Sequence, residues 1–296
     1  MNKDDVLKIF EANKNCILKD IRTDEKPIAV ILGGQPASGK GSISRLIEEE
    51  YLNKNFLIVN GDVFREYHPS HSTLVKNAES FSEKTQIFSN VFTEELIKTA
   101  GEKKYNIIVE GTMRNPAVVE NTALFFKEKG FSVEAHAVAA HPTITELNLY
   151  TRYAEEVRKH GTGRLADVNI HNQAASGVGK TLDNLYINKS VDKINIYQQQ
   201  SDPVRTFRLN RGVNFNLQQD NWSNQNLPSH FVNKFRNESL KNVDLLKANL
   251  KNADRVKDVL TEGIVKQSFV KVFSNVGKLF DLAAKAIKTF SQGLEM

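Results

Sequence analysis

The apolar and polar positions in the first two-thirds of the chain follow two alternating patterns. Short, nearly continuous apolar runs are typical of buried strands, and the segments between them repeat apolar residues every three or four positions, as amphipathic helices do. This alternation predicts an α/β fold, in which helices cover both faces of a parallel sheet. Strands are predicted at 28–33, 56–60, 105–110 and 132–140, and helices at about 4–21, 40–50, 83–100 and 116–129.

The last third of the chain has a different pattern. Two further strand candidates, at 193–197 and 204–209, would complete the sheet. A stretch rich in Asn, Gln and Ser follows, and then come two amphipathic patterns, at about 233–262 and 264–290, which predict helices. We therefore expect three parts: an α/β domain over 1–210, a polar linker over 211–232 and a basic helical C-terminal extension over 233–296.

The first predicted strand runs into a glycine-bounded loop and then into a helix. From Gly34 to Lys40 the residues fit the P-loop pattern G-x-x-x-x-G-K. In a P-loop, backbone N–H groups and a helix N-terminus hold phosphates, and the lysine reaches the terminal ones. The sequence thus predicts a site for a nucleoside triphosphate, ATP or GTP, formed by Gly34, Gln35, Pro36, Ala37, Ser38, Gly39, Lys40, Gly41 and Ser42.

One position departs from the usual P-loop ending. Gly41 stands where Ser or Thr normally follows the lysine, and the hydroxyl comes one residue later, at Ser42. Because the P-loop hydroxyl normally binds Mg²⁺, Ser42 is the candidate metal ligand. A second, looser match at 174–181 follows polar residues and lacks the buried strand that a phosphate loop needs. We expect that segment to be a helix end with a glycine cap.

Composition and charge favour a protein of a reducing compartment and argue against a secreted or membrane-spanning one. The single cysteine, Cys16, permits no internal disulfide, which suits a reducing compartment. The first residues lack the pattern of a secretory signal, and no apolar run approaches the ~18 residues of a membrane span. We therefore expect a cytoplasmic protein. From Arg205 onward 15 Lys and Arg stand against 8 Asp and Glu, whereas the preceding residues have 25 against 27, so the basic character belongs to the tail.

Polar residues follow the predicted strands at the edge where α/β proteins bind ligands. Asp62 comes after the second strand, where a carboxylate can accept the proton of a hydroxyl that attacks a γ-phosphate, or help to hold Mg²⁺. The alternative is that Asp62 only caps the following turn. Glu110 and Thr112 follow another strand and suit a polyhydroxylated ligand, although a surface turn would have a similar composition.

Two arginines are candidates for stabilising a phosphoryl-transfer transition state, in which negative charge gathers on the transferring oxygens. Arg164 follows 161–163, a flexible Gly-Thr-Gly stretch that is suited to a lid. Arg152 lies in a predicted helix near Glu155 and Glu156, so an ordinary ion pair on the helix surface is the alternative for this residue.

With these residues in place, the chain resembles the zeta-toxin family, the PezT-like P-loop kinases of bacterial toxin–antitoxin systems. In that family the γ-phosphoryl group of ATP or GTP is transferred to the 3′-hydroxyl of the amino sugar of UDP-N-acetylglucosamine. The resemblance rests on spaced blocks in order: 32–40, Asp62-Val63-Phe64 with His68-Pro69, Thr93-Glu94, Val109-Glu110-Gly111-Thr112 with Arg114, Arg152-Tyr153, and Arg164 with His171.

The resemblance implies a role for each candidate residue. Lys40 would hold the β- and γ-phosphates, and Asp62 would take the proton of the sugar hydroxyl. Arg152 and Arg164 would neutralise charge in the transition state. An epsilon-like antitoxin is the partner that family membership implies. The positions that match the family's sugar-nucleotide site are Glu94, Glu110, Thr112 and Arg114.

The residues leave other functions open. Met113 stands where small residues are common in the family, so a related UDP-sugar is an alternative acceptor. A phosphotransferase for another small molecule or for a nucleic-acid end would carry the same P-loop. A nucleotide-dependent binding module could instead use the basic tail. For that tail we favour packing on the protein itself over membrane contact, and we expect no nucleic-acid partner.

Overall fold

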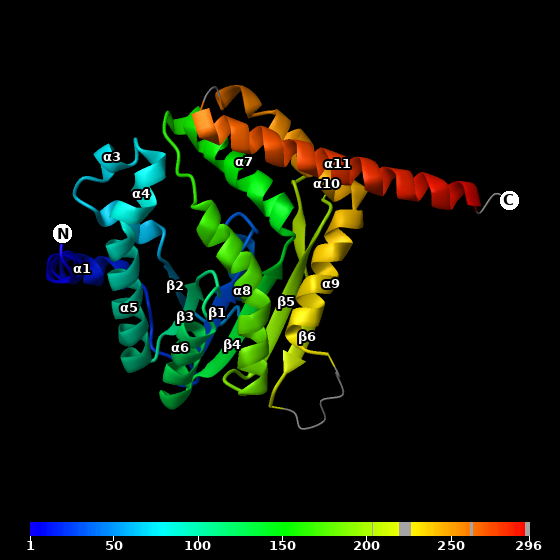
Figure 1. Cartoon of the computed structure of the whole chain (residues 1–296). Coiled ribbons are helices and arrows are strands. Elements are labelled where there is room, and N and C mark those ends of the chain that lie inside the picture. Colours follow the sequence, from blue (N-terminus) through cyan, green and yellow to red (C-terminus); the bar gives the residue numbers. More distant parts are fainter. Residues whose placement is uncertain (203, 219–225, 261–262, 294–296) are drawn as a thin grey trace.

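A sheet forms the centre of the computed structural model, which describes residues 1–202, 204–218, 226–260 and 263–293. Within these residues the sheet has six strands, in the order β2-β3-β1-β4-β5-β6. The first five in that order are parallel, and β6 runs antiparallel to β5 (Figure 1). The strands are β1 (Ile28–Gly33), β2 (Phe56–Asn60), β3 (Asn106–Glu110), β4 (Ser132–Ala139), β5 (Lys193–Gln200) and β6 (Arg208–Asn216).

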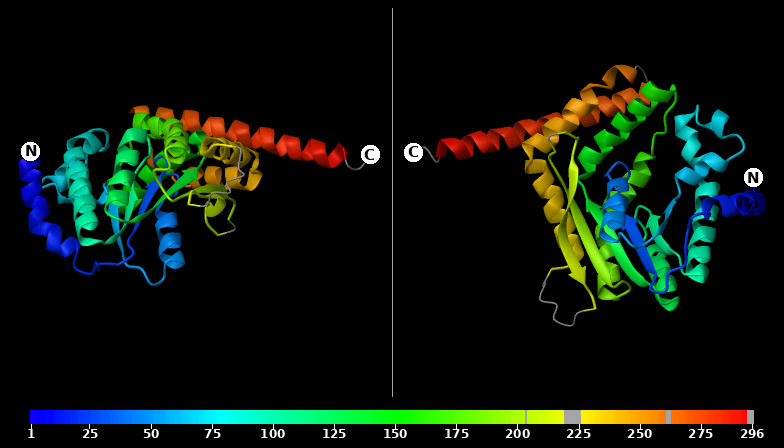
Figure 2. Two further views of the ribbon diagram at one scale, coloured as in Figure 1. Left: turned by 90° about the horizontal axis from the view of Figure 1, so that it is seen from below. Right: turned by 180° about the vertical axis from the view of Figure 1, so that it is seen from behind.

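Helices cover both faces of the sheet, which confirms the predicted α/β fold. Five helices (α1, α5, α6, α8 and α9) pack on one face, and α2 packs on the other (Figure 2). Two short 3₁₀ helices, Val63–Tyr67 and Lys257–Val259, lie in connecting segments. The helices are α1 (Lys3–Ile17), α2 (Gly41–Glu50), α3 (His71–Leu74), α4 (Ala78–Lys84), α5 (Gln86–Lys103), α6 (Pro116–Glu128), α7 (Pro142–His160), α8 (Val168–Ile187), α9 (Pro228–Lys241), α10 (Val243–Asp254) and α11 (Gly263–Gly293).

The central strand β1 explains the continuous apolar runs in the sequence. Ala29 and Ile31 belong to the core under the five helices, whereas Val30 and Leu32 belong to the core under α2. Successive side chains of a strand point to opposite faces, so a strand that is covered on both sides must be apolar throughout. Because β1, β2 and β3 are parallel, the segments that follow them meet at one edge of the sheet.

A second core lies beside the sheet, between α7, α10 and α11. Ile144 and Leu147 of α7 are fully buried there, together with Leu246 of α10 and Val276 of α11. Helix α11 lies along α7 and α10, and its C-terminal end projects beyond the rest of the molecule (Figure 1). The C-terminal helices therefore support α7, the helix that carries Arg152.

The second match to the P-loop pattern, at 174–181, lies inside a helix. Helix α8 continues through this segment to Ile187, so the prediction of a helix end with a glycine cap was wrong. The glycines serve packing instead. A Cβ on Gly177 would lie 2.5 Å from the carbonyl oxygen of Arg114, so a larger residue would push the loop after β3 away from α8.

The C-terminal third also departs from the predicted boundaries. Strand β6 extends to Asn216, so the first residues of the predicted linker belong to the sheet, and α9 already begins at Pro228. Residues 219–225 of that linker lie outside the described residues. The helix predicted at 233–262 is broken at Asn242, whose side chain accepts a hydrogen bond from the backbone N–H of Leu245 and begins α10. Such an N-cap is a local signal that helical periodicity alone does not show.

Among the described residues, no helix is both long enough and apolar enough to cross a bilayer.

Candidate active site

The predicted P-loop joins β1 to α2 in a backbone conformation that favours glycine. Gly34 and Gly39 have φ angles of +141° and +97°, which side chains disfavour, and Ala37 also has a positive φ of +61°. Lys40 directly precedes the first residue of α2. Its Nζ donates hydrogen bonds to the carbonyl oxygens of Gly34 (2.7 Å) and Gln35 (3.0 Å), so the ammonium group lies within the curve of the loop.

The loop has the properties of an anion site. Burial lowers the pKa of Lys40 to about 8, so a ligand with negative oxygens would stabilise its charged form. The Ser38 hydroxyl is buried and has no hydrogen-bond partner among the described residues. Among the described residues, no side chain lies within 4 Å of the position that a Cβ on Gly41 would take, so the space beside the first residue of α2 is open. These features fit the phosphates of a nucleoside triphosphate.

Asp62 lies just beyond β2 and is held by two arginines. Its Oδ2 is 2.7 Å from Nη1 of Arg164, and its Oδ1 is 3.3 Å from Nε of Arg65. Burial by itself would raise the pKa of Asp62, but the positive charges of Arg164 and Arg65 outweigh this effect and lower the pKa below its ordinary value. The carboxylate is therefore ionised at neutral pH and can act as a proton acceptor.

Arg65 is a residue that the sequence analysis missed. It is 5% exposed, and its Nη1 and Nη2 donate to the Ser82 carbonyl, to Oγ1 of Thr85 and to the Gln86 side chain. The guanidinium is therefore held rigidly while its Nε holds Asp62. The sequence offered one sign of this ion pair: Arg65 lies three residues after Asp62, and residues three apart face each other on a helical turn.

Arg152 and Arg164 meet at the same place from different elements. Glu156 joins them, since its Oε1 is 3.6 Å from Nε of Arg152 and its Oε2 accepts a hydrogen bond from the backbone N–H of Arg164. The predicted ion pair on the surface of α7 thus exists, but it also anchors the segment that carries Arg164. The Nε groups of both arginines are buried and have no hydrogen-bond acceptor among the described residues.

Glu110 ends β3 and connects three elements. Its Oε1 accepts a hydrogen bond from the Ser44 hydroxyl of α2 (2.9 Å), and its Oε2 accepts one from the Asn60 side chain of β2 (2.9 Å). The charges of Glu110 and Asp62 both act to raise the pKa of Lys40, whereas the charge of Arg152 acts to lower it. The structure therefore gathers Lys40, Asp62, Glu110 and Arg152 within electrostatic range of one another.

The loop after β3 carries Thr112 and Arg114 and is fixed by Met113 between them. The Met113 backbone has a φ of +50°, and its carbonyl accepts a hydrogen bond from the Thr181 hydroxyl of α8 (2.7 Å). Its side chain is buried, and a Cβ on Gly33 would lie 2.2 Å from it. Met113 thus packs under the P-loop, which gives a structural reason for a large residue at this position.

Glu94 is placed apart from these groups. It lies on α5, where its side chain is 52% exposed and pairs with Lys3 of α1 at 3.1 Å. Ser42, the candidate Mg²⁺ ligand, lies in the first turn of α2. In the part of the chain that the structure describes, no group of three or more His, Cys, Asp or Glu side chains could hold a metal ion by itself.

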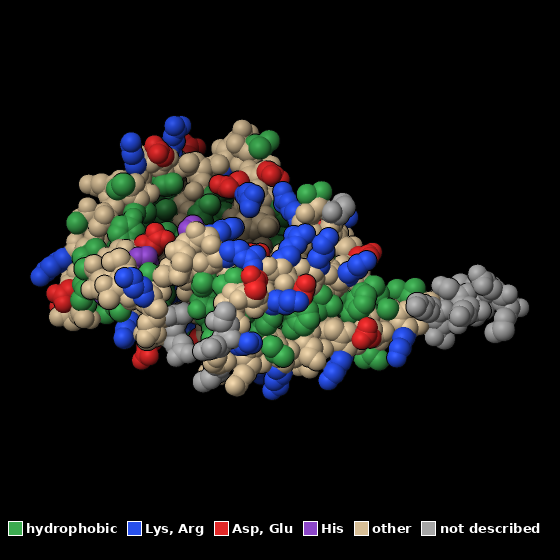
Figure 3. All heavy atoms as spheres, turned by 90° about the horizontal axis from the view of Figure 1, so that it is seen from above, with side chains coloured by type: hydrophobic (Ala, Val, Ile, Leu, Met, Phe, Trp, Pro, Cys, Tyr) green, Lys and Arg blue, Asp and Glu red, His purple; other side chains and the backbone are tan. Residues whose placement is uncertain are grey.

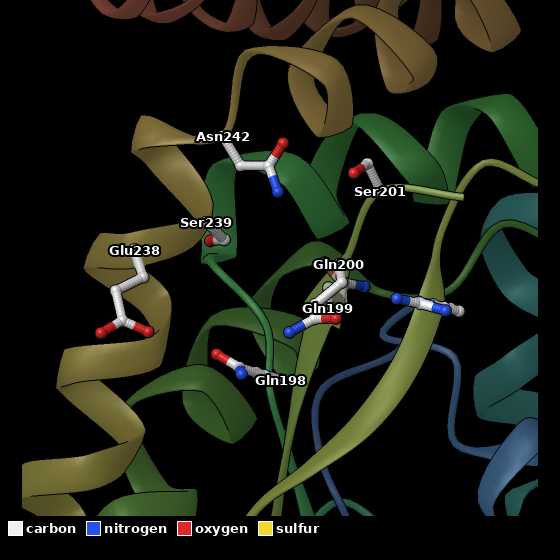
Figure 4. A pocket seen from close by; sticks show the side chains of 8 residues that line it. Gln198, Gln199, Gln200, Ser201, Glu238, Ser239 and Asn242 are labelled. Atoms are coloured by element: carbon white, nitrogen blue, oxygen red, sulfur yellow. The ribbon is translucent and has the colours of Figure 1, made fainter. Parts of the chain in front are cut away.

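The surface above the site is hollowed, and Lys and Arg side chains gather between the hollow and α11 (Figure 3). A polar cavity of about 380 Å³ lies next to the P-loop, between β5, β6 and the end of α9. One of its residues, Gln199, donates a hydrogen bond to the carbonyl of Ser38 (3.1 Å) and so connects the cavity wall to the loop. The wall consists of amide, hydroxyl and charged side chains of β5, β6 and the α9–α10 turn (Figure 4): Gln198, Gln199, Gln200, Ser201, Arg208, Glu238, Ser239 and Asn242.

Two solved structures with the same fold are a toxin–antitoxin system and a two-protein complex with ATP. A chain from the structure of the PezAT chromosomal toxin–antitoxin system of Streptococcus pneumoniae matches with a TM-score of 0.67 at 21% identity, over 88% of this chain and 98% of that chain. A chain of the AvrRxo1-ORF1:AvrRxo1-ORF2 complex with ATP matches with a TM-score of 0.51 at 14% identity, over 94% of this chain and 87% of that chain. At these identities the matches show the fold alone.

Sequence comparison gives the family. Toxin PezT of S. pneumoniae serotype 4 is 33% identical over 144 residues, which are 48% of this chain and 56% of that toxin. Toxin zeta of Enterococcus hirae is 30% identical over 185 residues, 60% of this chain and 62% of that toxin. The chain thus spans less than two-thirds of the length of these two relatives. The family model described as zeta toxin matches residues 14–211, about two-thirds of the chain, and the chain therefore belongs to the zeta toxin family.

Proposed function

We propose that the protein is a kinase that transfers the γ-phosphoryl group of ATP or GTP to the 3′-hydroxyl of the amino sugar of UDP-N-acetylglucosamine or a related UDP-sugar. In this proposal it acts as the toxin of a toxin–antitoxin system and is bound by an antitoxin. One observation carries the phosphoryl-transfer step. The P-loop lysine Lys40, the ionised carboxylate of Asp62 and the buried, unsatisfied Nε groups of Arg152 and Arg164 converge at one edge of the sheet.

The arrangement supports a role for each side chain. Lys40 and the N–H groups at the start of α2 would bind the β- and γ-phosphates. Asp62 would accept the proton of the attacking sugar hydroxyl as the new O–P bond forms and the bond from the γ-phosphorus to the bridging oxygen breaks. Arg152 and Arg164 would donate hydrogen bonds to the transferring oxygens. Bound nucleotide supplies the phosphoryl group, and Mg²⁺ would offset the negative charge of its phosphates.

The contact between Arg164 and Asp62 implies a rearrangement on substrate binding. At 2.7 Å, Nη1 of Arg164 occupies one oxygen of the carboxylate that the proposal assigns as proton acceptor. Each oxygen of Asp62 keeps a second lone pair for the sugar hydroxyl, but Nη1 of Arg164 would have to leave Asp62 in order to reach the phosphoryl group. Gly161 and Gly163 precede Arg164, and glycine tolerates the wide range of backbone angles that such a movement of the segment requires.

The sugar would lie beyond the end of β3. Glu110, Thr112 and Arg114 line this edge next to Asp62 in the strand order, with β2 and β3 adjacent. Glu110 keeps acceptor capacity on each oxygen, because a carboxylate oxygen has two lone pairs and the protein uses one on each. Glu94 pairs with Lys3 and would need to change partner to contact a sugar nucleotide.

The test is mass spectrometry of purified protein incubated with Mg·ATP or Mg·GTP and a panel of UDP-sugars. We expect one added phosphate on UDP-N-acetylglucosamine or a close relative. Asp62→Asn should lower the rate by about 10²–10⁴-fold, the usual contribution of a general base, while nucleotide affinity stays nearly unchanged. Lys40→Ala should lose both phosphoryl transfer and nucleotide binding. Asp20→Asn, at an exposed position in the connection before β1, is the control and should behave as wild type.

Two outcomes would contradict the proposal. If nucleotide binds but no UDP-sugar gains a phosphate, the acceptor belongs to another class, such as a different small molecule or a nucleic-acid end. If Asp62→Asn keeps most of the activity, Asp62 is not the base. A nucleotide-dependent binding module would tolerate Asp62→Asn and would instead lose function when the lysines of the C-terminal helix are replaced together.

A further inference from the structure

The side chain of Gln35, the second residue of the P-loop, is fully buried and is held from outside the loop. Its Nε2 donates hydrogen bonds to the carbonyl oxygen of Ala140 (2.7 Å) and to Oγ1 of Thr145 (3.2 Å). Ala140 follows β4 and Thr145 lies in the first turns of α7. The P-loop is therefore tied to the beginning of the helix that carries Arg152.

Arg236 of α9 reaches the same place from the C-terminal part of the chain. Its Nε donates to the carbonyl oxygen of Ala140 (3.1 Å), and its Nη2 lies 3.5 Å from Oε1 of Gln35. Burial lowers the pKa of Arg236 to about 10, and among the described residues no carboxylate offsets this effect. Among the described residues, this half-buried guanidinium is held by carbonyl and amide oxygens, and these hydrogen bonds offset its partial loss of hydration.

His171 of α8 continues this set of contacts. Its Nδ1 lies 2.9 Å from Oδ1 of Asn172, and its Nε2 lies 2.8 Å from Oγ1 of Thr145. An amide oxygen can only accept, so Nδ1 donates to Asn172, while Nε2 lies within hydrogen-bond distance of the Thr145 hydroxyl. Burial lowers the pKa of His171, which favours this neutral ring. The P-loop, α7 and α8 are thus connected through buried hydrogen bonds, and α9 joins them through the half-buried hydrogen bonds of Arg236.

We propose that Arg236 is a positioning residue of the P-loop, which holds Gln35 through the shared Ala140 carbonyl and thereby keeps the loop in its phosphate-binding conformation. The effect would reach the nucleotide through Lys40, whose Nζ donates to the Gln35 carbonyl at 3.0 Å. Helix α9 is then a part of the nucleotide site, although it lies almost 200 residues after the loop in the sequence. The inference rests on the proposed function only in taking a nucleoside triphosphate as the ligand of the loop.

The first test needs no nucleotide. Hydrogen–deuterium exchange of the full-length protein, read by mass spectrometry over a peptide that spans 33–41, would be compared between wild type, Arg236→Met, Gln35→Met and the double variant. We expect exchange several-fold faster in each single variant and no further increase in the double variant, because both substitutions break the same connection. Lys234→Met, at an exposed position of α9, is the matched control and should exchange as wild type.

The second test is the affinity for ATP. Arg236→Met should weaken binding by about tenfold, the effect expected when a buried hydrogen-bond partner is removed. Arg236→Lys keeps the charge but not the two-sided geometry and should recover only part of the affinity. Thermal unfolding of each variant identifies the temperature range in which all of them are folded. If Arg236 acts by positioning Gln35, the double variant should bind ATP about as weakly as the weaker single variant. A general loss of packing would instead give effects that add.

The outcomes distinguish this inference from the proposed function. Unchanged exchange over 33–41 in folded Arg236→Met would overturn the positioning role, and so would additive effects of the two substitutions on that exchange. If wild type binds no nucleotide, the proposed function fails, while the exchange experiment still decides whether Arg236 holds the loop.

Discussion

At the scale of single residues, the state of Lys40 depends on opposing effects. Burial lowers its pKa to about 8, the nearby charges of Glu110 and Asp62 act to raise it, and Arg152 lowers it further. An ordinary lysine has a pKa near 10.5. In the absence of nucleotide, Lys40 therefore begins to lose its proton within the range of pH in which kinases are usually assayed, and its charge becomes available for phosphate binding only when it is protonated.

We predict that nucleotide affinity falls as the pH rises above 8. Phosphates stabilise the charged lysine, so above pH 8 the free protein must take up a proton in order to bind, and the affinity should drop by about fivefold between pH 8 and pH 9. Titration calorimetry of ATP binding from pH 7 to 9 would measure this change. Lys40→Met should bind more weakly at every pH and lack the decline. A wild-type affinity that stays constant over this range would disprove the role of Lys40 ionisation.

At the scale of elements, α7 links the active site to the C-terminal helices. Its buried face, with Ile144 and Leu147, packs on α10 and α11, while Arg152 on the same helix reaches the phosphate site. A helix that places a catalytic side chain must be held rigidly, since a shift of 1 Å at such a group costs much of its effect. The packing of α10 and α11 should therefore affect catalysis as well as stability.

We predict that Leu246→Ala in α10 lowers the free energy of unfolding by about 2–5 kcal/mol, because Leu246 is fully buried and the truncation leaves a cavity. Chemical denaturation would measure this loss. At a temperature where the variant is folded, its turnover should fall because α7 carries Arg152, and its ATP affinity should fall as well because Gln35 of the P-loop is bound to Thr145 of α7. Leu52→Ala, at a position that is 83% exposed, is the control and should change neither. Equal effects of the two substitutions would contradict the role of this core.

Most elements near the P-loop could be predicted, and those of the C-terminal part were placed less well. The predicted strand at 28–33 coincides with β1, and the predicted helix at 40–50 differs from α2 by one residue at its start. These elements have strong periodicity and glycine signals within a few residues. The break at Asn242 and the start of β6 at Arg208 depend on a capping hydrogen bond and on pairing with β5, which periodicity does not show.

At the scale of the whole molecule, the C-terminal part and the sheet share their cores. Phe215 of β6 packs with Val232 and Phe235 of α9 in the main core, and a Cβ on Gly212 would lie 2.5 Å from the Phe235 ring. The division of the chain at 210 and 232 stays a prediction, but these contacts indicate that the parts fold together.

We predict that a chain of residues 1–210 does not unfold cooperatively, because it lacks α9 on the sheet and leaves the apolar face of α7 exposed to water. A chain of residues 1–286 is the matched control: it keeps Val276, the last residue that is fully buried among those whose burial is described, and should unfold near the wild-type temperature. Circular dichroism and thermal denaturation of both would show the difference. A cooperative transition of the shorter chain at the wild-type temperature would instead support an independent domain.

The sequence by itself determined the features that depend on neighbours along the chain. The P-loop, the strand before it and the helix after it could be read from fifteen consecutive residues, and Asp62 and Glu110 from their places after strands, because glycine freedom and side-chain alternation act locally. Only the tertiary structure decided that Arg164 pairs with Asp62, that Glu94 pairs with Lys3 and that Arg236 reaches Gln35. These pairs lie far apart in sequence, and the packing of whole elements brings them within hydrogen-bonding distance.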